Sequence, residues 1–394
     1  MSTTPYRRRL ALFVLFFVTG LAISSWVTRT PDIRDLLHAS TAEMGVVLFG
    51  LSAGSMIGIL CSGALVTRFG TRPVTLIGSA GVIISMPTLG LGAATSQSWL
   101  ATFGLFLFGL GVGGGEVAMN IEGADVEREI GRPVLPAMHG CFSLGTTVGA
   151  VAGILFTASH FPVVWHLVIV GGLGLIALPS VAGLLPAGVG RVPRREQGTA
   201  RPPRPAVWKD VRLLMIGAIV LAMALAEGAA NDWLPLVMVD GHGFAPALGS
   251  AVFAVFAAAM TVGRFAGGYF IERFGRATVL RASAIAGVAG LALVIFVDNQ
   301  VVAGTAVILW GLGASLGFPV TLSAAGDSGE HAAARVSLVA AVGYVAFLVG
   351  PPLLGYLGEH FGLRAALLVP LALLAAAVFL TSAVGRRPVP AEVG

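Results

Sequence analysis

The chain consists of long apolar runs separated by short polar segments. A run of about 20 predominantly apolar residues is long enough for a helix to cross the hydrocarbon core of a bilayer, and the sequence contains twelve such runs. None of them alternates between apolar and polar residues with a period of two, which excludes a transmembrane β-barrel. We therefore expect an all-α integral membrane protein with twelve transmembrane helices. The predicted spans cover residues 10–28, 42–66, 73–94, 98–120, 134–157, 163–186, 211–234, 247–270, 277–297, 301–322, 335–357 and 363–384.

The composition of the chain agrees with this pattern. Of the 394 residues, 56% are apolar and only 11% are charged, whereas an average soluble domain is about 25% charged. This excludes an ordinary soluble enzyme, because a water-exposed surface needs far more charge than a lipid-exposed one. The 54 glycines follow no collagen-like period and favour helices that pack closely through small residues.

Basic residues are distributed unevenly about the predicted spans. If the amino terminus is cytoplasmic, all but four of the 24 Lys and Arg residues lie in inner loops and tails. The exceptions are Arg29, Arg34 and Arg364 in outer loops and Arg264 within a span. The positive-inside rule therefore predicts that both termini are cytoplasmic, and it explains the net charge of +5 without a nucleic-acid partner.

The spans form two sets of six. Residues 187–210 separate these sets and are rich in Pro, Arg and Gly, which is typical of a flexible linker. We expect an N-terminal six-helix bundle over residues 1–186, a cytoplasmic linker over 187–210 and a C-terminal six-helix bundle over 211–394.

The two sets also share a repeated motif at the end of their second span. The first copy reads GALVTRFGTR over residues 63–72, and the second reads GYFIERFGR over residues 268–276, at an offset of 205 residues. Trp26 and Trp233 correspond at a similar offset. Parallel six-helix repeats are typical of transporters in which two bundles rock about a site at the membrane midplane.

These motifs resemble the signature G-x-L-x-D-R-x-G-R/K-R/K of the major facilitator superfamily, with Thr67 where the family has Asp. The resemblance implies the major facilitator fold and transport by alternating access. In such a motif, Arg can pair with a helix C-terminus or an acid in one conformation only, and so act as a latch. The alternative is a positive-inside anchor. The candidate gating residues are Gly63, Arg68, Gly70, Arg72, Gly268, Glu272, Arg273 and Gly275.

A second motif lies in the fourth span, where Glu116, Ala118 and Asn120 form E-x-A-x-N. It resembles the fucose permease branch of the superfamily, which implies that Glu116 is a proton-linked carboxylate in a sugar cavity. Glu116 and Asn120 are four residues apart and share one helix face. An acid within a span is costly unless it lines an aqueous cavity, is paired or is protonated. The alternative is a Glu that caps or pairs at the inner end of the helix.

The seventh span repeats this pattern with Glu227 and Asn231, outside the 205-residue offset. We expect Glu227 in the outer half of its span, with Asp232 and Trp233 at the membrane interface, so that a wetted helix end is an equal alternative. For Arg264, we expect the side chain to snorkel toward the cytoplasm rather than to pair with an acid.

Two further residues complete the candidate cavity. His139 in the fifth span is a candidate polar ligand or proton partner, and a His that packs against a neighbouring helix is the alternative. Trp26, near the end of the first span, is the other candidate.

The sequence thus predicts a secondary active transporter of the bacterial inner membrane, which moves a small polar solute, a sugar or sugar-like molecule, with protons. The alternative is proton-antiport efflux of a drug or metabolite, which would use the many Phe and Met side chains. We expect a monomer whose partners are its small-molecule substrate, protons and the lipid bilayer. We expect no enzymatic activity, cofactor, metal or nucleic-acid partner, since the chain contains no Walker A, HExxH or CxxC sequence and no loop longer than about 25 residues.

Overall fold

The computed structural model describes residues 4–131, 134–191, 207–327 and 332–385. All regular secondary structure in these ranges is helical. Twelve of the described helical segments are long and apolar enough to cross a membrane. The prediction of an all-α, multi-pass membrane protein is therefore confirmed.

The chain divides into two compact units. The first unit comprises Met1–Ala200, Phe244–Ala254 and Pro351–His360, and the second comprises the rest, Arg201–Gly243, Val255–Gly350 and Phe361–Gly394. Most of the predicted linker, residues 192–206, lies outside the described residues. The boundaries of the two six-helix bundles stay a prediction.

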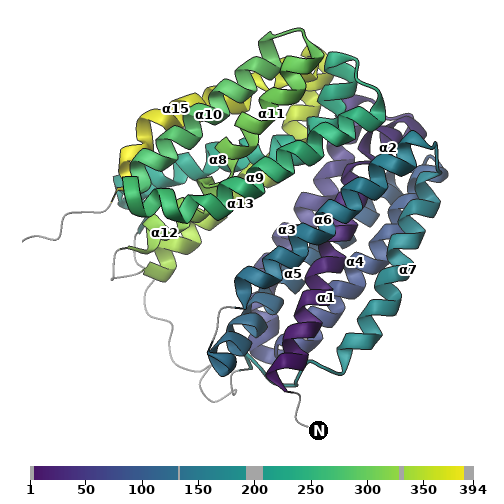
Figure 1. Ribbon diagram of the computed structural model, residues 1–394, viewed down its shortest axis with the longest axis vertical. Helices are drawn as coiled ribbons and strands as arrows, with labels where there is room; N and C mark the ends of the chain where they lie inside the picture. The colour runs from purple at the N-terminus through teal and green to yellow at the C-terminus, as the bar shows by residue number, and fades with distance from the viewer. Residues whose placement is uncertain (1–3, 132–133, 192–206, 328–331, 386–394) are drawn as a thin grey trace, which may run out of the picture. The chain divides into compact units, whose positions relative to one another are not determined.

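In the first unit, long helices run alongside one another, and one short helix follows the first of them (Figure 1). The unit includes α1 (Pro5–Val27), α2 (Thr30–Leu37), α3 (Thr41–Phe69), α4 (Thr71–Ala94), α5 (Ser98–Ile130), α6 (Leu135–Ala158) and α7 (Val163–Ala182).

Glycines allow α5 to pack closely on both α3 and α4. A Cβ added at Gly113 would overlap the backbone of Ser55 on α3, and one added at Gly111 would overlap the carbonyl of Gly78 on α4. The glycine-rich run at residues 111–115 is therefore a packing surface within a continuous helix, which fixes the direction of the remaining side chains of α5.

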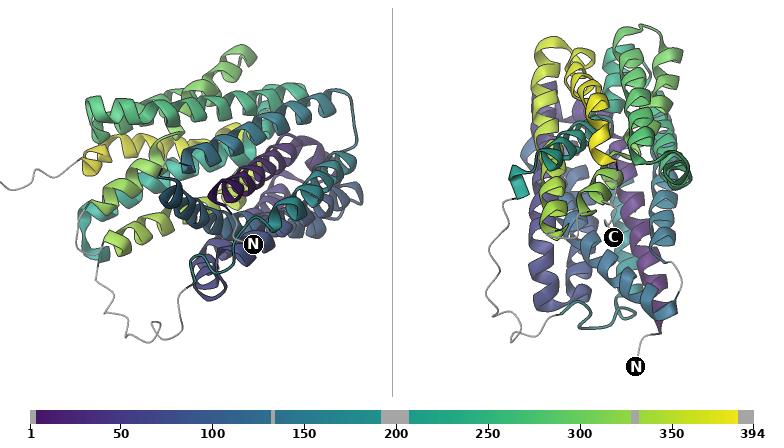
Figure 2. Two further views of the ribbon diagram at one scale, coloured as in Figure 1. Left: turned by 60° about the horizontal axis from the view of Figure 1, so that its bottom comes forward. Right: turned by 90° about the vertical axis from the view of Figure 1, so that its left-hand side faces the viewer.

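Figures 1 and 2 show the long helices of the second unit, and two of its described spans are interrupted. The α8 helix continues through a π-helical turn at Val237–Gly241, and one span is divided into α11 and α12. Its helices are α8 (Val211–Leu236), α9 (Pro246–Phe274), α10 (Arg276–Phe296), α11 (Gln300–Ala314), α12 (Gly317–Gly326), α13 (Ala332–Phe361), α14 (Leu363–Ala366) and α15 (Leu368–Leu380). The N-terminal part of α9 and the C-terminal part of α13 are grouped with the first unit.

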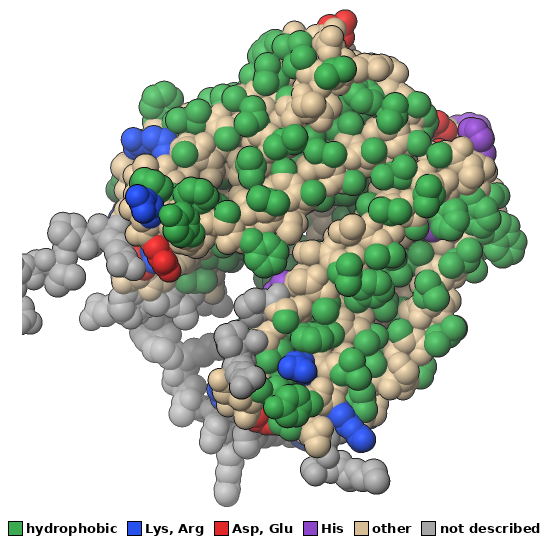
Figure 3. All heavy atoms as spheres, in the orientation of Figure 1, with side chains coloured by type: hydrophobic (Ala, Val, Ile, Leu, Met, Phe, Trp, Pro, Cys, Tyr) green, Lys and Arg blue, Asp and Glu red, His purple; other side chains and the backbone are tan. Residues whose placement is uncertain are grey.

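Hydrophobic side chains are spread over the whole surface shown in Figure 3, and few charged side chains appear on it. This is the surface that a hydrocarbon environment requires, because charged groups are costly in the bilayer core.

Among the predicted boundaries that differ from the structure, two bear on the candidate acids. The fourth span was expected to end at residue 120, but α5 continues to Ile130, and the seventh was expected to end at 234, but its helical segment continues to Gly241. Both extensions are too polar or too irregular to register as apolar runs. They matter because they change how far Glu116 and Glu227 lie from the ends of their helices.

The glycines of the repeated motif have two different roles. Gly70 and Gly275 adopt φ of +87° and +80° at the turns between α3 and α4 and between α9 and α10, a conformation that is almost restricted to glycine. Gly63 and Gly268 lie within helices, and an added Cβ at either would contact nothing within 4 Å. The sharp turn therefore requires only the second glycine of each copy.

Candidate functional site

An ion pair joins α8 to α9 within the second unit. The Arg264 Nη2 atom donates to Glu227 Oε1 at 2.9 Å. Glu227 lies sixteen residues from Val211 and fourteen from Gly241, near the middle of its span. The Arg264 side chain is 46% exposed, whereas that of Glu227 is 12% exposed. The pair thus combines a buried carboxylate with an accessible guanidinium near the middle of the membrane-spanning segment.

The same arginine contacts the interruption between α11 and α12. Arg264 Nε donates to the Ser315 carbonyl at 3.4 Å, and Ser315 lies between the end of α11 and the start of α12. A broken transmembrane helix presents polar backbone groups that a continuous helix would use internally, and such breaks are common at transporter binding sites. Three elements therefore converge at Arg264.

Aromatic packing supports the turn of α8 that carries Glu227. The indole N–H of Trp310 donates to the Ala226 carbonyl at 3.0 Å, and the ring of Phe256 packs against Trp310 edge to face at 5.7 Å. Asn231 lies one turn further along α8 and is half-buried. Glu227 is thus held on a packed helical surface and not on a frayed helix end.

One expectation for this region is wrong, and two others stay predictions. Arg264 pairs with an acid and does not snorkel to the cytoplasm. Glu227 lies near the middle of its span, so its assignment to the outer half stays a prediction. Asp232 and Trp233 are buried within the protein, and their placement at the membrane interface stays a prediction.

The candidate acid of the first unit also lies well away from both ends of its helix. Glu116 is eighteen residues from Ser98 and fourteen from Ile130, and both it and Asn120 are half-buried. A cap at the helix end does not fit Glu116, since α5 continues for about 21 Å beyond it, whereas pairing with a neighbouring group stays an alternative.

Trp26 and His139 occupy different levels of the first unit. Trp26 is buried, its ring packs edge to face with that of Phe108 at 6.1 Å, and its indole N–H has no hydrogen-bond partner among the described residues. His139 is exposed and packs against Phe16 at 5.1 Å. Because Phe16 precedes Trp26 by ten residues on α1, the two candidates are separated by about 15 Å along the helix.

A charged cluster that the sequence reasoning missed joins α1 to the extension of α5. The buried Arg8 side chain donates to Glu122 at 2.8 Å, to Asp125 at 2.6 Å and to Glu129, and Thr71 also donates to Glu122. The acids follow one another at intervals of three and four residues, a spacing that places them on one helix face. That spacing was the available signal, and it was hidden by the assumption that the helix ended at residue 120.

A smaller polar link lies at the start of α8. The Asp210 carboxylate caps the helix by accepting from the N–H groups of Arg212 and Leu213, and it also accepts from Arg335 Nη1 at 2.6 Å. The hydrogen bond from Arg335 holds the pKa of Asp210 below its ordinary value, so this link stays charged in mildly acidic conditions.

The motif arginines have equivalent surroundings in the two units. The guanidinium of Arg68 lies over the Phe69 ring at 5.0 Å, and that of Arg273 lies over Phe274 at 5.7 Å. Neither arginine forms an ion pair within the described residues. Thr67, which replaces the family's Asp, donates to the Ala64 carbonyl of its own helix. A latch contact stays a prediction for both copies.

Comparison with known proteins gives a consistent result. The profile of the family described as Major Facilitator Superfamily matches residues 12–345. An uncharacterised MFS-type transporter of Yersinia pestis is 29% identical over 374 residues, which cover 92% of this chain and 94% of that protein.

Two solved structures resemble the whole fold. A mutant form of the nucleoside transporter NupG has a TM-score of 0.79 at 14% identity and covers 96% of this chain and 100% of that chain. The transporter FucP, in the outward conformation, has a TM-score of 0.67 at 16% identity. The match covers 96% of this chain and 99% of that chain. At these identities the likeness shows the fold alone.

Proposed function

Because the chain belongs to the Major Facilitator Superfamily of secondary transporters, which are not enzymes, we propose that it carries a small polar solute across the bacterial inner membrane together with protons. The observation that supports coupling is the ion pair between Glu227 and Arg264 near the middle of a membrane span. A sugar-like solute is compatible with the amides Asn120 and Asn231, which offer both donors and acceptors.

The pair couples solute to protons through the charge of Glu227. A carboxylate beside an arginine is stable as an anion, but it must take up a proton when the arginine turns to another partner, because an unpaired charge in the membrane interior is costly. Solute that engages the accessible guanidinium of Arg264 therefore favours protonation of Glu227. Glu116 is the second proposed proton carrier, in the first unit.

Transport by alternating access requires elements that favour one state over the other. We assign this role to the motif arginines, Arg68 and Arg273, each of which is available for an acid or a helix C-terminus in one state only. The proposed protein is a monomer, since each subunit of this arrangement contains both repeats.

The test of the proposed function begins with a thermal-shift screen of sugars, polyols, nucleosides, amino acids and cationic dyes, because a bound solute raises the unfolding temperature. For a polar solute found in this way, proteoliposomes with an imposed pH gradient are expected to accumulate it above its external concentration. The proposal fails if uptake only equilibrates the solute. Proton-driven extrusion of an apolar dye would instead establish the efflux alternative.

The proposed orientation places both termini and residues 187–210 in the cytoplasm, because the inner loops collect nearly all Lys and Arg residues. Single cysteines at Gln97 and Gln197, in a variant without Cys61 and Cys141, are expected to differ in whole cells. An impermeant thiol reagent should label position 97, in the turn between α4 and α5, and should spare position 197 until the cells are opened. Equal labelling of the two positions contradicts this orientation.

A further inference from the structure

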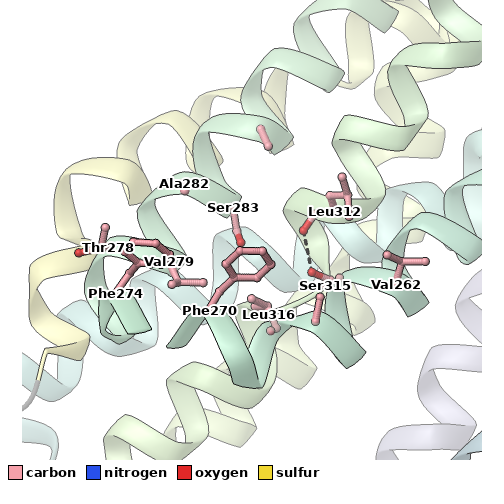
Figure 4. A pocket seen from close by; sticks show the side chains of 14 residues that line it. Val262, Phe270, Phe274, Thr278, Val279, Ala282, Ser283, Leu312, Ser315 and Leu316 are labelled. Carbon is pink, nitrogen blue, oxygen red and sulfur yellow. Dashed lines mark hydrogen bonds between the residues drawn. The ribbon is translucent and has the colours of Figure 1, made fainter. Parts of the chain in front are cut away.

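An apolar pocket of about 450 Å³ lies between α9, α10 and the α11–α12 interruption of the second unit. Figure 4 shows Phe270 reaching into it from α9, and Thr278, Ser283 and Ser315 contribute hydroxyl groups to its lining. None of the residues that line the pocket carries a charge. A pathway for a polar solute needs polar groups along its wall, so this pocket fits an apolar occupant better.

The length of the pocket matches one leaflet of a bilayer. Along α9 it runs from Val262 to Phe274, twelve residues that correspond to about 18 Å of helix. Half of a typical hydrocarbon core is about 15 Å. The pocket ends where α9 ends, at the Gly275 turn, and therefore spans the depth of an acyl chain that hangs from one membrane surface.

Several apolar residues that line the pocket on α9 are also exposed on the outer surface of the protein. Val262, Phe270 and Phe274 line it and are 61%, 45% and 53% exposed, and their neighbours Phe265 and Tyr269 on α9 are also exposed. Large apolar side chains that remain exposed on a membrane-spanning helix are suited to contact with hydrocarbon. A lipid chain can therefore enter from the side without crossing water.

A positive charge lies at the end of the pocket. The Arg273 guanidinium is 5.7 Å from the centroid of the Phe274 ring, which itself lines the pocket. The nearby Arg276 is neutralised by Asp327 at 2.6 Å, whereas Arg273 has no ion pair among the described residues. The end of the pocket at the Gly275 turn thus offers an anionic headgroup an arginine that lacks an ion pair in the described part of the chain.

We propose that this pocket binds an anionic phospholipid, with one acyl chain between α9, α10 and the α11–α12 interruption and the phosphate on Arg273. In the proposed orientation it comes from the cytoplasmic leaflet. Because Arg273 is also the proposed latch, bound lipid would compete with the latch contact and link the state of the transporter to membrane composition. The lipid site itself does not depend on the identity of the transported solute.

Binding of the acyl chain is tested by a substitution that places a large side chain in the pocket. Ala282 lines the pocket on α10, whereas Ile285 on the same helix is exposed and does not. Native mass spectrometry of protein released from nanodiscs of equal parts phosphatidylglycerol and phosphatidylcholine is expected to show one retained phosphatidylglycerol. Ala282→Phe should lose it and Ile285→Phe should keep it. Equal retention by the two variants overturns the site.

The headgroup part is tested with matched arginines. Arg273→Gln is expected to reduce the preference for phosphatidylglycerol over phosphatidylcholine about fivefold, the effect of one arginine near an anionic surface. Arg68→Gln is the control, since Arg68 lies over Phe69 in the same way but does not border this pocket. An equal loss in both variants, or displacement of the lipid by millimolar glycerol phosphate without acyl chains, contradicts the proposal.

Discussion

Replacement of Arg8 with Met is expected to lower the free energy of unfolding by about 3–5 kcal/mol, a large fraction of the stability of a folded domain. Arg8 is buried, and three carboxylates surround it, of which Glu122 is 1% exposed. Removing the guanidinium leaves Glu122 buried without a counter-ion, and it also removes the link between α1 and the extension of α5. Thermal or denaturant unfolding of the purified protein in detergent measures the effect.

The neighbouring Arg7 provides the control for this variant. It is exposed and forms no ion pair among the described residues, so Arg7→Met should change the unfolding free energy by less than about 0.5 kcal/mol. Addition of Glu122→Gln to Arg8→Met should recover part of the loss, because the unpaired charge is then absent. Similar stabilities for Arg7→Met and Arg8→Met would show that the cluster does not support the fold.

The number and order of the spans could be predicted from the sequence because each one depends on local composition. The end of α5 could not, since the helical residues Glu122, Asp125 and Glu129 resemble a polar loop when only average hydropathy is considered. Their environment is set by Arg8, which is 114 residues away from Glu122. Hydropathy contains no information about such a partner.

The candidate acids were identifiable from sequence for a different reason. A carboxylate within an apolar run, such as Glu116 or Glu227, is rare enough to indicate function without any tertiary knowledge. The pairing of Glu227 with Arg264 was not predictable in the same way, because it depends on how α8 packs against α9. The available signal was that two opposite charges lay within spans of one unit, where mutual pairing lowers the cost of both.

Glu227→Gln is expected to abolish accumulation of solute driven by a pH gradient. The amide keeps the shape of the side chain and an oxygen that accepts from Arg264, but it cannot bind and release a proton. With one proton per solute and a gradient of one pH unit, the accumulation ratio should fall from about tenfold to one, since one unit corresponds to about 1.36 kcal/mol. Exchange of labelled for unlabelled solute should persist, because the loaded carrier can still reorient.

Two further variants separate the roles of the charged groups. Arg264→Gln should lose both accumulation and exchange, because it removes the group that we expect to contact solute. Asp35→Asn, at an exposed acid paired with Arg34 outside the spans, should retain both. If Glu116→Gln loses accumulation while Glu227→Gln keeps it, the proton is carried in the first unit and the ion pair is structural.

The most direct test of proton coupling is the pH change inside proteoliposomes when solute is added outside, with no pH gradient imposed beforehand. The wild-type protein is expected to acidify the interior as solute enters, at a rate proportional to solute uptake. Glu227→Gln should exchange solute without any change in internal pH. Equal acidification by the two proteins would contradict coupling through Glu227, and uptake by the wild type without acidification would contradict proton symport itself.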